Sequence, residues 1–192
     1  MEEIAERYRR RAADFGAKVA GVAPGDWERA SPCAKWSARD VVGHIVEMHG
    51  FMLTPVGRSL GPVTVAEDPV VAFEQARAAV EAVLADAELA NQEVDTPAGR
   101  LTAAANIDQV ISDDLVLHGW DLARATGQDE TMNPEDVERL WRSTTALPAE
   151  LIEQFRTPGA FGPGEEVFGP EVPVAEDAPL QDRLLGFIGR TP

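Results

Sequence analysis

The sequence predicts an all-α protein built as a helical bundle, with additional short helices and an irregular C-terminal tail. About six segments repeat apolar residues at helical spacing, and loops of moderate length join them. Strand signals are nearly absent, and the sequence shows no internal repeat or low-complexity tract. Long helices with such connections favour a bundle. We expect a single domain over residues 1–192, with the tail at about residues 158–192.

Two helices are predicted near the N-terminus. Residues 2–20 form the first, because charged residues separate apolar ones at helical spacing, namely Ile4, Tyr8, Ala12, Phe15 and Val19. A segment with Pro and Gly then interrupts the pattern. The second helix follows Ser37 and continues to about Leu53. Ser37 and Asp40 fit a capping box, in which each side chain bonds to the backbone amide of the other residue.

The middle of the chain contains two more predicted helices and a polar loop. The third helix covers about residues 68–89, and Pro69 suits its first helical position. The stretch "NQEVDTPAGRLTAA", residues 91–104, is polar and contains Gly and Pro, so it predicts a loop with a short extended piece. The fourth helix covers about residues 104–126 as one element. Gly127 follows it, where glycine commonly ends a helix.

The helical pattern is weaker toward the C-terminus. The fifth helix opens at "NPED", where Asn133 is the cap and Pro134 takes the first position, and it runs to about residue 155. The stretch "TPGAFGPGEEVFGPEVPV", residues 157–174, is rich in Gly and Pro and has too little apolar pattern for a regular element. A short last helix is expected at about residues 179–188.

The charge balance excludes several classes of partner. The chain has 33 acidic and 17 basic residues, a formal net charge of −16. It therefore repels a phosphate backbone, and the basic cluster "RYRRR", residues 7–11, is interpreted as one turn of a solvated helix face. We expect no nucleic-acid partner and no membrane partner. Because the apolar runs are too short to span a membrane and no signal-peptide pattern is seen, the expected location is cytoplasmic.

The sequence contains one cysteine, Cys33, so an intramolecular disulfide and a metal cluster built from cysteines are excluded. Cys33 lies in "SPCAKWS", just before the second predicted helix. Two interpretations stay open, a reactive thiol and a small buried apolar side chain. The second is favoured, because a lone cysteine is more often simply buried.

The stretch "DDLVLHGWDLARATG", residues 113–127, places polar side chains on an apolar helix face. With about 100° between successive residues, Asp114 lies about 40° from His118 and Asp121 lies about 60° from it. The apolar residues around these positions are Ile107, Ile111, Leu115 and Leu122. We therefore expect Asp114, His118 and Asp121 on the buried side. An unpaired carboxylate there would cost several kcal/mol.

The second predicted helix carries two histidines. His44 shares an arc with apolar residues, whereas His49 is rotated by about 140° from it. We expect His44 to point inward and His49 to lie at the edge of the apolar face. A divalent cation would neutralise Asp114, and an i, i+4 pair with His118 can bind one ion, with His44 supplied by the facing helix. Two histidines and one carboxylate with an open position suit zinc or non-haem iron.

An interpretation without metal is also open. His44 and His118 would then be core histidines that bond to each other or to Asp114, and on spacing alone the two interpretations stand about even. Asp121 has two roles open as well. It either orients the His118 imidazole as a hydrogen-bond acceptor, or it is a solvent-facing acid or structural hydrogen-bond partner. Trp36, Met48 and Phe51 could line a pocket, although such side chains are usually core.

Two motifs occur together in this chain, W-x-x-x-D-x-x-x-H in "WSARDVVGHI" and D-x-x-x-H-x-W-D in "DDLVLHGWDLARATG". With "SPCAKW" before them and "FGPEVPVAEDAPLQDRLLGFIGRTP" at the end, the chain resembles the DinB-like superfamily over nearly its whole length. Within it, the similarity is to the branch that contains the mycothiol-dependent maleylpyruvate isomerase metal-binding domain. The chain also resembles actinobacterial proteins that are described only as metal-binding.

The resemblance implies an up-down-down-up four-helix bundle. It also implies three metal ligands, His44 from the second helix and Asp114 with His118 from a later one. The isomerase has Glu where this chain has Asp114, and the shorter side chain of Asp would change the position of the ion or the preferred metal. The isomerase also carries a further C-terminal domain, where this chain has a short tail. Several members use a low-molecular-weight thiol, which the metal would bind as a thiolate nucleophile.

Two functions follow from these expectations. The first is a metal- and thiol-dependent transferase or isomerase that acts on a small electrophile, with zinc as the expected ion, nickel or iron as alternatives, and mycothiol as cosubstrate. The second is a non-catalytic metal-binding or sensing module whose ion stabilises the bundle. An open coordination position beside a pocket favours the enzyme, and a closed one favours the module. The expected partners are a thiol and an electrophile, and a homodimer is allowed.

Overall fold

The computed structural model describes all residues except 1, 63, 97–98 and 161–166. The chain divides into two compact units, Met1–Glu130 and Thr131–Pro192. Helices dominate both, and the strands of the described residues form one small two-stranded sheet. The all-α prediction is therefore confirmed. Whether residues 1–192 make one domain stays a prediction.

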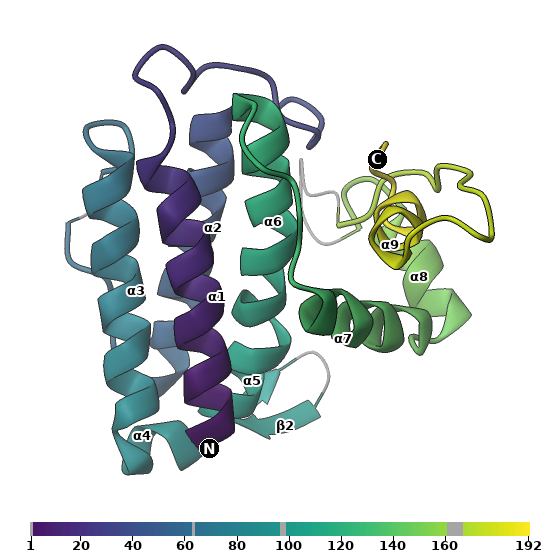
Figure 1. Cartoon of the computed structure of the whole chain (residues 1–192). Coiled ribbons are helices and arrows are strands. Elements are labelled where there is room, and N and C mark those ends of the chain that lie inside the picture. Colours follow the sequence, from purple (N-terminus) through teal and green to yellow (C-terminus); the bar gives the residue numbers. More distant parts are fainter. Residues whose placement is uncertain (1, 63, 97–98, 161–166) are drawn as a thin grey trace. The chain divides into compact units, whose positions relative to one another are not determined.

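The first unit combines long helices with several short elements. The long helices are α1 (Glu2–Ala20), α2 (Ala38–Leu53), α3 (Pro69–Ala85) and α6 (Ile111–Thr126). The short elements are η1 (Thr54–Val56), α4 (Ala87–Asn91), β1 (Glu93–Thr96), β2 (Gly99–Thr102) and α5 (Ala103–Gln109). Figure 1 shows the long helices side by side, with α4, α5 and the strands at one end.

The long helices form a closed bundle, because α1 and α2 each pack against both α3 and α6. α1 and α6 run parallel. Arg7 near the start of α1 bonds to Asp108 just before α6, and Lys18 near its end bonds to the carbonyl of Asp129 just after α6. α2 and α3 also run parallel, since Arg39 at the start of α2 bonds to the segment that precedes α3. The order is up-down-down-up, as the resemblance implied (Figure 1).

Apolar packing fills the interior of the bundle. The rings of Phe15 on α1 and Phe73 on α3 have centroids 4.9 Å apart. Further large side chains are fully buried around them, namely Ile45, Leu53, Ile107, Ile111, Leu115 and Leu122. Burying one such side chain stabilises the fold by about 1.5–3 kcal/mol. These contacts come from α1, α2, α3, α5 and α6, so they hold the frame that carries the polar side chains described below.

The predicted helix ends are confirmed where capping chemistry specified them. Ser37 and Asp40 form the capping box, with the Ser37 amide donating to Asp40 Oδ2 at 2.8 Å. Asp68 caps α3 and Asn133 caps α7 through their side chains. Gly127 ends α6 with a φ of 72°, a left-handed conformation that glycine adopts without strain. Each polar N-cap contributes about 1 kcal/mol.

Other predicted helices are interrupted. The helix expected over 68–89 breaks at Asp86, whose side chain caps α4. The helix expected over 104–126 breaks at Val110, where φ is −105° and ψ is −78°. The helix expected over 133–155 breaks before Pro148, because proline cannot continue a helix. The loop expected over 91–104 contains the hairpin of β1 and β2, in which Glu93 pairs with Thr102.

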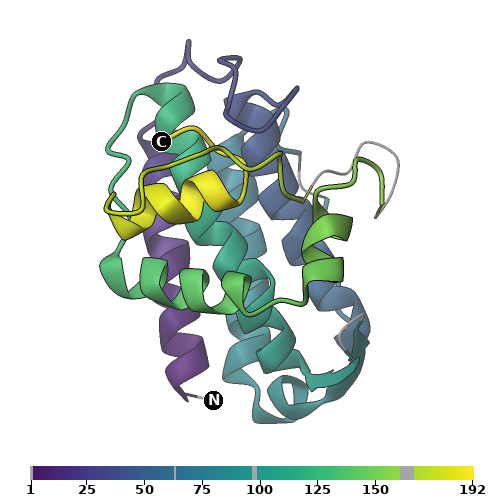
Figure 2. The ribbon, with the colours of Figure 1, turned by 90° about the vertical axis from the view of Figure 1, so that its right-hand side faces the viewer.

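The second unit contains α7 (Pro134–Thr145), α8 (Ala149–Phe155) and α9 (Leu180–Phe187). α7 and α9 lie side by side (Figure 2), and the rings of Trp141 and Phe187 have centroids 6.0 Å apart. The predicted last helix is confirmed. Residues 157–160 and 167–174 form no helix or strand, as expected, and residues 161–166 of that segment lie outside the described residues.

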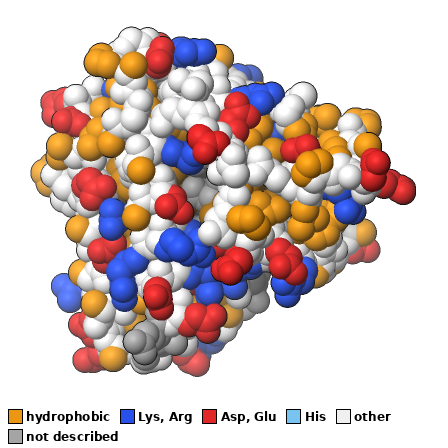
Figure 3. Space-filling model, in the orientation of Figure 1, with side chains coloured by type: hydrophobic (Ala, Val, Ile, Leu, Met, Phe, Trp, Pro, Cys, Tyr) orange, Lys and Arg blue, Asp and Glu red, His pale blue; other side chains and the backbone are white. Residues whose placement is uncertain are grey.

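The basic cluster at residues 7–11 does not form a solvated face. The side chain of Arg11 is fully buried, and its Nη1 lies 2.7 Å from Asp113 Oδ1. Arg7 donates two hydrogen bonds to Asp108, both at 2.8 Å. Acidic side chains lie beside the basic ones on the face shown in Figure 3. The solvated-turn interpretation is therefore wrong for Arg7 and Arg11, because acids on the facing elements pair with them.

His49 also differs from its expected place at the edge of the apolar face. It is fully buried, with Nε2 2.8 Å from the Tyr8 hydroxyl and Nδ1 2.6 Å from the Ile45 carbonyl oxygen. A carbonyl only accepts, so Nδ1 carries the proton and the tyrosine hydroxyl donates to Nε2. Burial lowers the pKa of His49 from its ordinary 6.5 to about 4, so the ring is neutral at pH 7.

This burial predicts a pH-dependent stability. The unfolded chain binds the His49 proton below pH 6.5, whereas the folded chain resists it until about pH 4. Stability is therefore complete above pH 6.5 and falls as the pH drops, by about 2 kcal/mol at about pH 5 and about 3 kcal/mol in total. Urea unfolding at several pH values measures this. His49→Gln should be flatter than the wild type between pH 7 and 5, and equal slopes would contradict the assignment.

Within the described residues, none of the helices combines the length and the apolar character that a membrane span requires.

Candidate metal centre

The three predicted ligands lie where α2 faces α6. His44 is in the middle of α2, and its Nε2 is 3.8 Å from Oδ2 of Asp114 in the first turn of α6. One turn further along α6, the ring of His118 has its centroid 4.9 Å from that of His44. The structure therefore brings His44 close to both other residues. The side chains of His44 and Asp114 are 21% and 27% exposed, so this edge of the cluster opens to solvent.

Trp36 lies against both histidine rings. Its ring centroid is 4.9 Å from that of His44 and 5.7 Å from that of His118. The loop that carries Trp36 is fixed by a hydrogen bond from the Ser31 amide to the Trp36 carbonyl, 2.8 Å long, and by a left-handed turn at Lys35 with a φ of 70°. The indole consequently restricts water on one side of the two imidazoles.

Asp121 holds the other side of the His118 ring. Its Oδ2 lies 2.9 Å from His118 Nδ1, and its side chain is completely buried. The solvent-facing alternative for Asp121 is therefore wrong. A carboxylate accepts, so Nδ1 carries the imidazole proton in this contact and Nε2 keeps a lone pair. This is the arrangement by which a carboxylate orients a metal-binding histidine.

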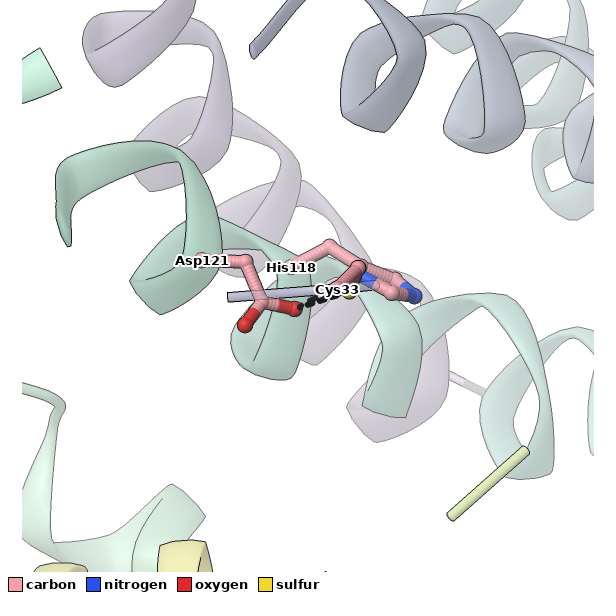
Figure 4. A group of neighbouring side chains, drawn as sticks. All are labelled: Cys33, His118 and Asp121. Carbon is pink, nitrogen blue, oxygen red and sulfur yellow. Dashed lines mark hydrogen bonds and ion pairs between the residues drawn. The ribbon is translucent and has the colours of Figure 1, made fainter. Parts of the chain in front are cut away.

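Cys33 joins this contact, which the helix periodicity did not indicate. Its Sγ donates to Asp121 Oδ2 at 3.1 Å and lies 3.9 Å from His118 Nδ1 (Figure 4). The favoured interpretation of a buried apolar cysteine is wrong, because Cys33 is only partly buried and its thiol is hydrogen-bonded to a carboxylate. Cys33 belongs to a loop, so a helical wheel cannot place it. Its position in "SPCAKW", three residues before Trp36, was the available signal.

The distances between ligand atoms separate Cys33, His118 and Asp121 from His44 and Asp114. Among the described residues, the His, Cys, Asp or Glu side chains whose ligand atoms all lie within 4.8 Å of one another are Cys33, His118 and Asp121. His44 and Asp114 are outside that group. The assignment of His44, Asp114 and His118 as the ligands of one ion accordingly stays a prediction.

The nitrogen and oxygen donors nevertheless fit a divalent ion. Two imidazoles on one tetrahedral zinc have ring centroids about 5 Å apart, close to the 4.9 Å between His44 and His118. The His44–Asp114 distance of 3.8 Å exceeds the ~3.3 Å between nitrogen and oxygen ligands of one ion. A rotation of the partly exposed Asp114 side chain would close that difference.

A groove on the same helix as His44 includes Gly43, the chain neighbour of His44, in its lining. It has a volume of about 480 Å³, lies along α2, and is lined by Gly43, Glu47, Phe51 and Leu60 among others. Phe51 is 54% exposed there, so it lines a pocket rather than the core. Met48 packs against the core instead. The groove offers apolar surface on the helix that carries His44.

Comparison with known proteins points to one family. The family model of the mycothiol maleylpyruvate isomerase N-terminal domain matches residues 8–123, which include all the side chains of the cluster. Two proteins of Mycobacterium tuberculosis, from strains CDC 1551 / Oshkosh and ATCC 25618 / H37Rv, are each 32% identical over 183 residues. Each match covers 92% of this chain and 92% of the relative, and both relatives are named as uncharacterized. No solved structure matches the chain significantly.

Proposed function

Because the chain belongs to the family of the mycothiol maleylpyruvate isomerase N-terminal domain, we propose that it binds a divalent metal ion and a thiol of the mycothiol type. With these it would act on a small electrophile as a transferase or isomerase. The ligands are His44, Asp114 and His118, and zinc is the expected ion, with nickel or iron as alternatives. One observation carries the proposal, the approach of His44 to both Asp114 and His118 beneath Trp36.

Each residue around the proposed metal site would have a separate role. The neutral Nε2 of His118 is aimed by the bond from Nδ1 to Asp121, which keeps the ring from rotating. Trp36 limits water at the rings, and the solvent-open edge at His44 and Asp114 admits the thiol. When bound, the ion would stabilise the thiolate form of that thiol as a nucleophile. The groove at Phe51 would accept the apolar part of the electrophile.

The proposal places the protein in the cytoplasm, where low-molecular-weight thiols stay reduced. The thiol and the electrophile are its proposed partners. A non-catalytic metal-binding or sensing module is the alternative, and it would need the same ligands without turnover.

The role of Asp121 gives a graded prediction. Asp121→Asn keeps the size of the side chain but removes the charge that holds the Nδ1 proton of His118. We expect the affinity for Zn²⁺ to fall by about 10- to 100-fold. Competition with a fluorescent zinc chelator measures it, and Glu47→Gln, an exposed change on α2, is the matched control. Unchanged affinity in Asp121→Asn would show that the carboxylate does not act on His118.

The function itself is tested on protein purified without an affinity tag. Its metal content is measured first, and thiol transfer to a model electrophile is then assayed with mycothiol and with surrogate thiols. We expect turnover that is lost with a chelator and returns with the metal. If the metal-loaded protein transfers no thiol while it binds the ion stoichiometrically, the enzyme proposal fails and the metal-binding module replaces it.

A further inference from the structure

We propose that Cys33, His118 and Asp121 form a cation site of their own, on the Nδ1 side of the His118 ring. The site would take a thiophilic divalent ion, such as Cd²⁺ or Zn²⁺. It is distinct from the ligand set proposed above, which uses Nε2 of the same ring. The Cys33 site can exist whether or not His44, Asp114 and His118 bind a metal. Only the competition between the two sites rests on the proposed function.

The three ligand atoms already have nearly the spacing that one ion imposes. A tetrahedral zinc site separates sulfur from its nitrogen or oxygen neighbours by about 3.5 Å, and nitrogen from oxygen by about 3.3 Å. Cys33 Sγ lies 3.1 Å from Asp121 Oδ2 and 3.9 Å from His118 Nδ1, and that nitrogen lies 2.9 Å from Oδ2. Each distance differs from the expected one by about 0.4 Å. Small side-chain shifts would therefore admit an ion.

The charges of the three ligands also suit a divalent ion. A thiolate and a carboxylate carry two negative charges, and the imidazole is neutral. Asp121 is completely buried and His118 is 11% exposed, so a cation there would be poorly screened by water. Sulfur and nitrogen ligands select zinc and softer ions over Mg²⁺ or Ca²⁺. Binding would replace the two protons that now point at Asp121 Oδ2, those of the thiol and of Nδ1.

The backbone fixes the cysteine for this role. The Cys33 amide donates to Ser31 Oγ at 3.2 Å, and the Cys33 carbonyl accepts from the Trp36 amide at 3.1 Å. His118 and Asp121 are three residues apart on α6, which places them on one face of that helix. In Figure 4 the three side chains converge from the loop and from α6. Cys33 is only partly buried, so the site is not enclosed deep in the core.

The two ligand sets cannot both use a neutral His118. With the proton on Nδ1, the lone pair is on Nε2 and the ring can serve the set with His44. An ion on Nδ1 sends that proton to Nε2, and the thiol proton leaves to solvent, so Nε2 becomes a donor. A thiophilic ion held by Cys33 would therefore remove His118 from the other set and block it.

Cadmium binding gives a direct test, because a Cd²⁺–thiolate bond produces a near-ultraviolet charge-transfer band and the chain has one cysteine. Wild-type protein titrated with Cd²⁺ should show the band and bind one ion per chain. Cys33→Ser should lose the band and weaken Cd²⁺ binding by about 100-fold or more, since a lost ligand costs at least as much as a lost supporting contact. No band in the wild type, or equal Cd²⁺ affinity in Cys33→Ser, would overturn the site.

His44→Ala separates this inference from the proposed function. It removes a ligand of the other set only, so it should keep the wild-type Cd²⁺ band and affinity. Loss of the band in His44→Ala would show that Cys33 shares a single site with His44, against the proposal. Two Cd²⁺ ions per wild-type chain, with the band present, would overturn the competition between the sets. Absence of thiol transfer in the wild type would refute the proposed function and leave the Cys33 band unaffected.

Discussion

Replacing His44 with alanine is expected to abolish metal-dependent thiol transfer and to lower Zn²⁺ affinity by more than the roughly 100-fold that loss of a supporting contact can cost. The imidazole is one of the two proposed nitrogen ligands, and an ion left with Asp114 and His118 would complete its shell with water. The ring is also 21% exposed, so its removal leaves no closed cavity in the core. The fold should survive, because the apolar contacts of α2 lie on its buried face.

Two controls make that result specific. Glu47→Gln lies one turn away on the same helix, is exposed and is not one of the proposed ligands, so its zinc affinity should equal that of the wild type. Circular dichroism should give the same helix content for both variants. If His44→Ala binds zinc as tightly as Glu47→Gln does, the ligand assignment is wrong, and the histidines are core residues bonded to one another or to Asp114.

Arg11→Ala is expected to destabilise the first unit by about 3–5 kcal/mol, because it leaves the Asp113 carboxylate without its buried partner. The guanidinium is fully buried and Asp113 is 17% exposed, with 2.7 Å between Nη1 and Oδ1. The lost side chain also leaves unfilled volume between α1 and α6. The free energy of unfolding in urea measures the effect.

A double variant tests whether the charge causes that loss. Arg11→Met with Asp113→Asn removes both charges and keeps similar volumes, so it should recover most of the stability. Arg11→Met alone should stay destabilised, since it fills the space and still removes the guanidinium that faces Asp113. Equal stability of the single and double variants would assign the loss to packing.

Helix periodicity predicted much of the candidate site but little of its surroundings. His44, Asp114, His118 and Asp121 were found because helix geometry fixes which face a residue occupies. The same periodicity predicted one helix through Val110. The backbone departs from helical geometry at that residue, and no local residue type indicates the break. Ile107 on α5 and Ile111 on α6 are both buried, because the two helices pack against the same core.

The side chains that sequence reasoning misplaced depend on tertiary contacts. Trp36 and Cys33 reach the site from a loop, for which no periodicity exists. His49 is buried because Tyr8 of α1 supplies a partner across the bundle. Arg11 is buried because Asp113 of α6 does the same. For both residues the cross-bundle partner lies on another helix, so the periodicity of their own helix could not reveal their burial.

The central claim is that one ion is held between α2 and α6 by His44, Asp114 and His118. The most direct test is an anomalous-difference map from zinc-soaked crystals of the Cys33→Ser variant, in which the competing thiol is absent. The account predicts a peak about 2.0–2.2 Å from Nε2 of both histidines and from an Asp114 oxygen. His118 Nδ1 should stay bonded to Asp121. A map without a peak between His44 and His118 would contradict it.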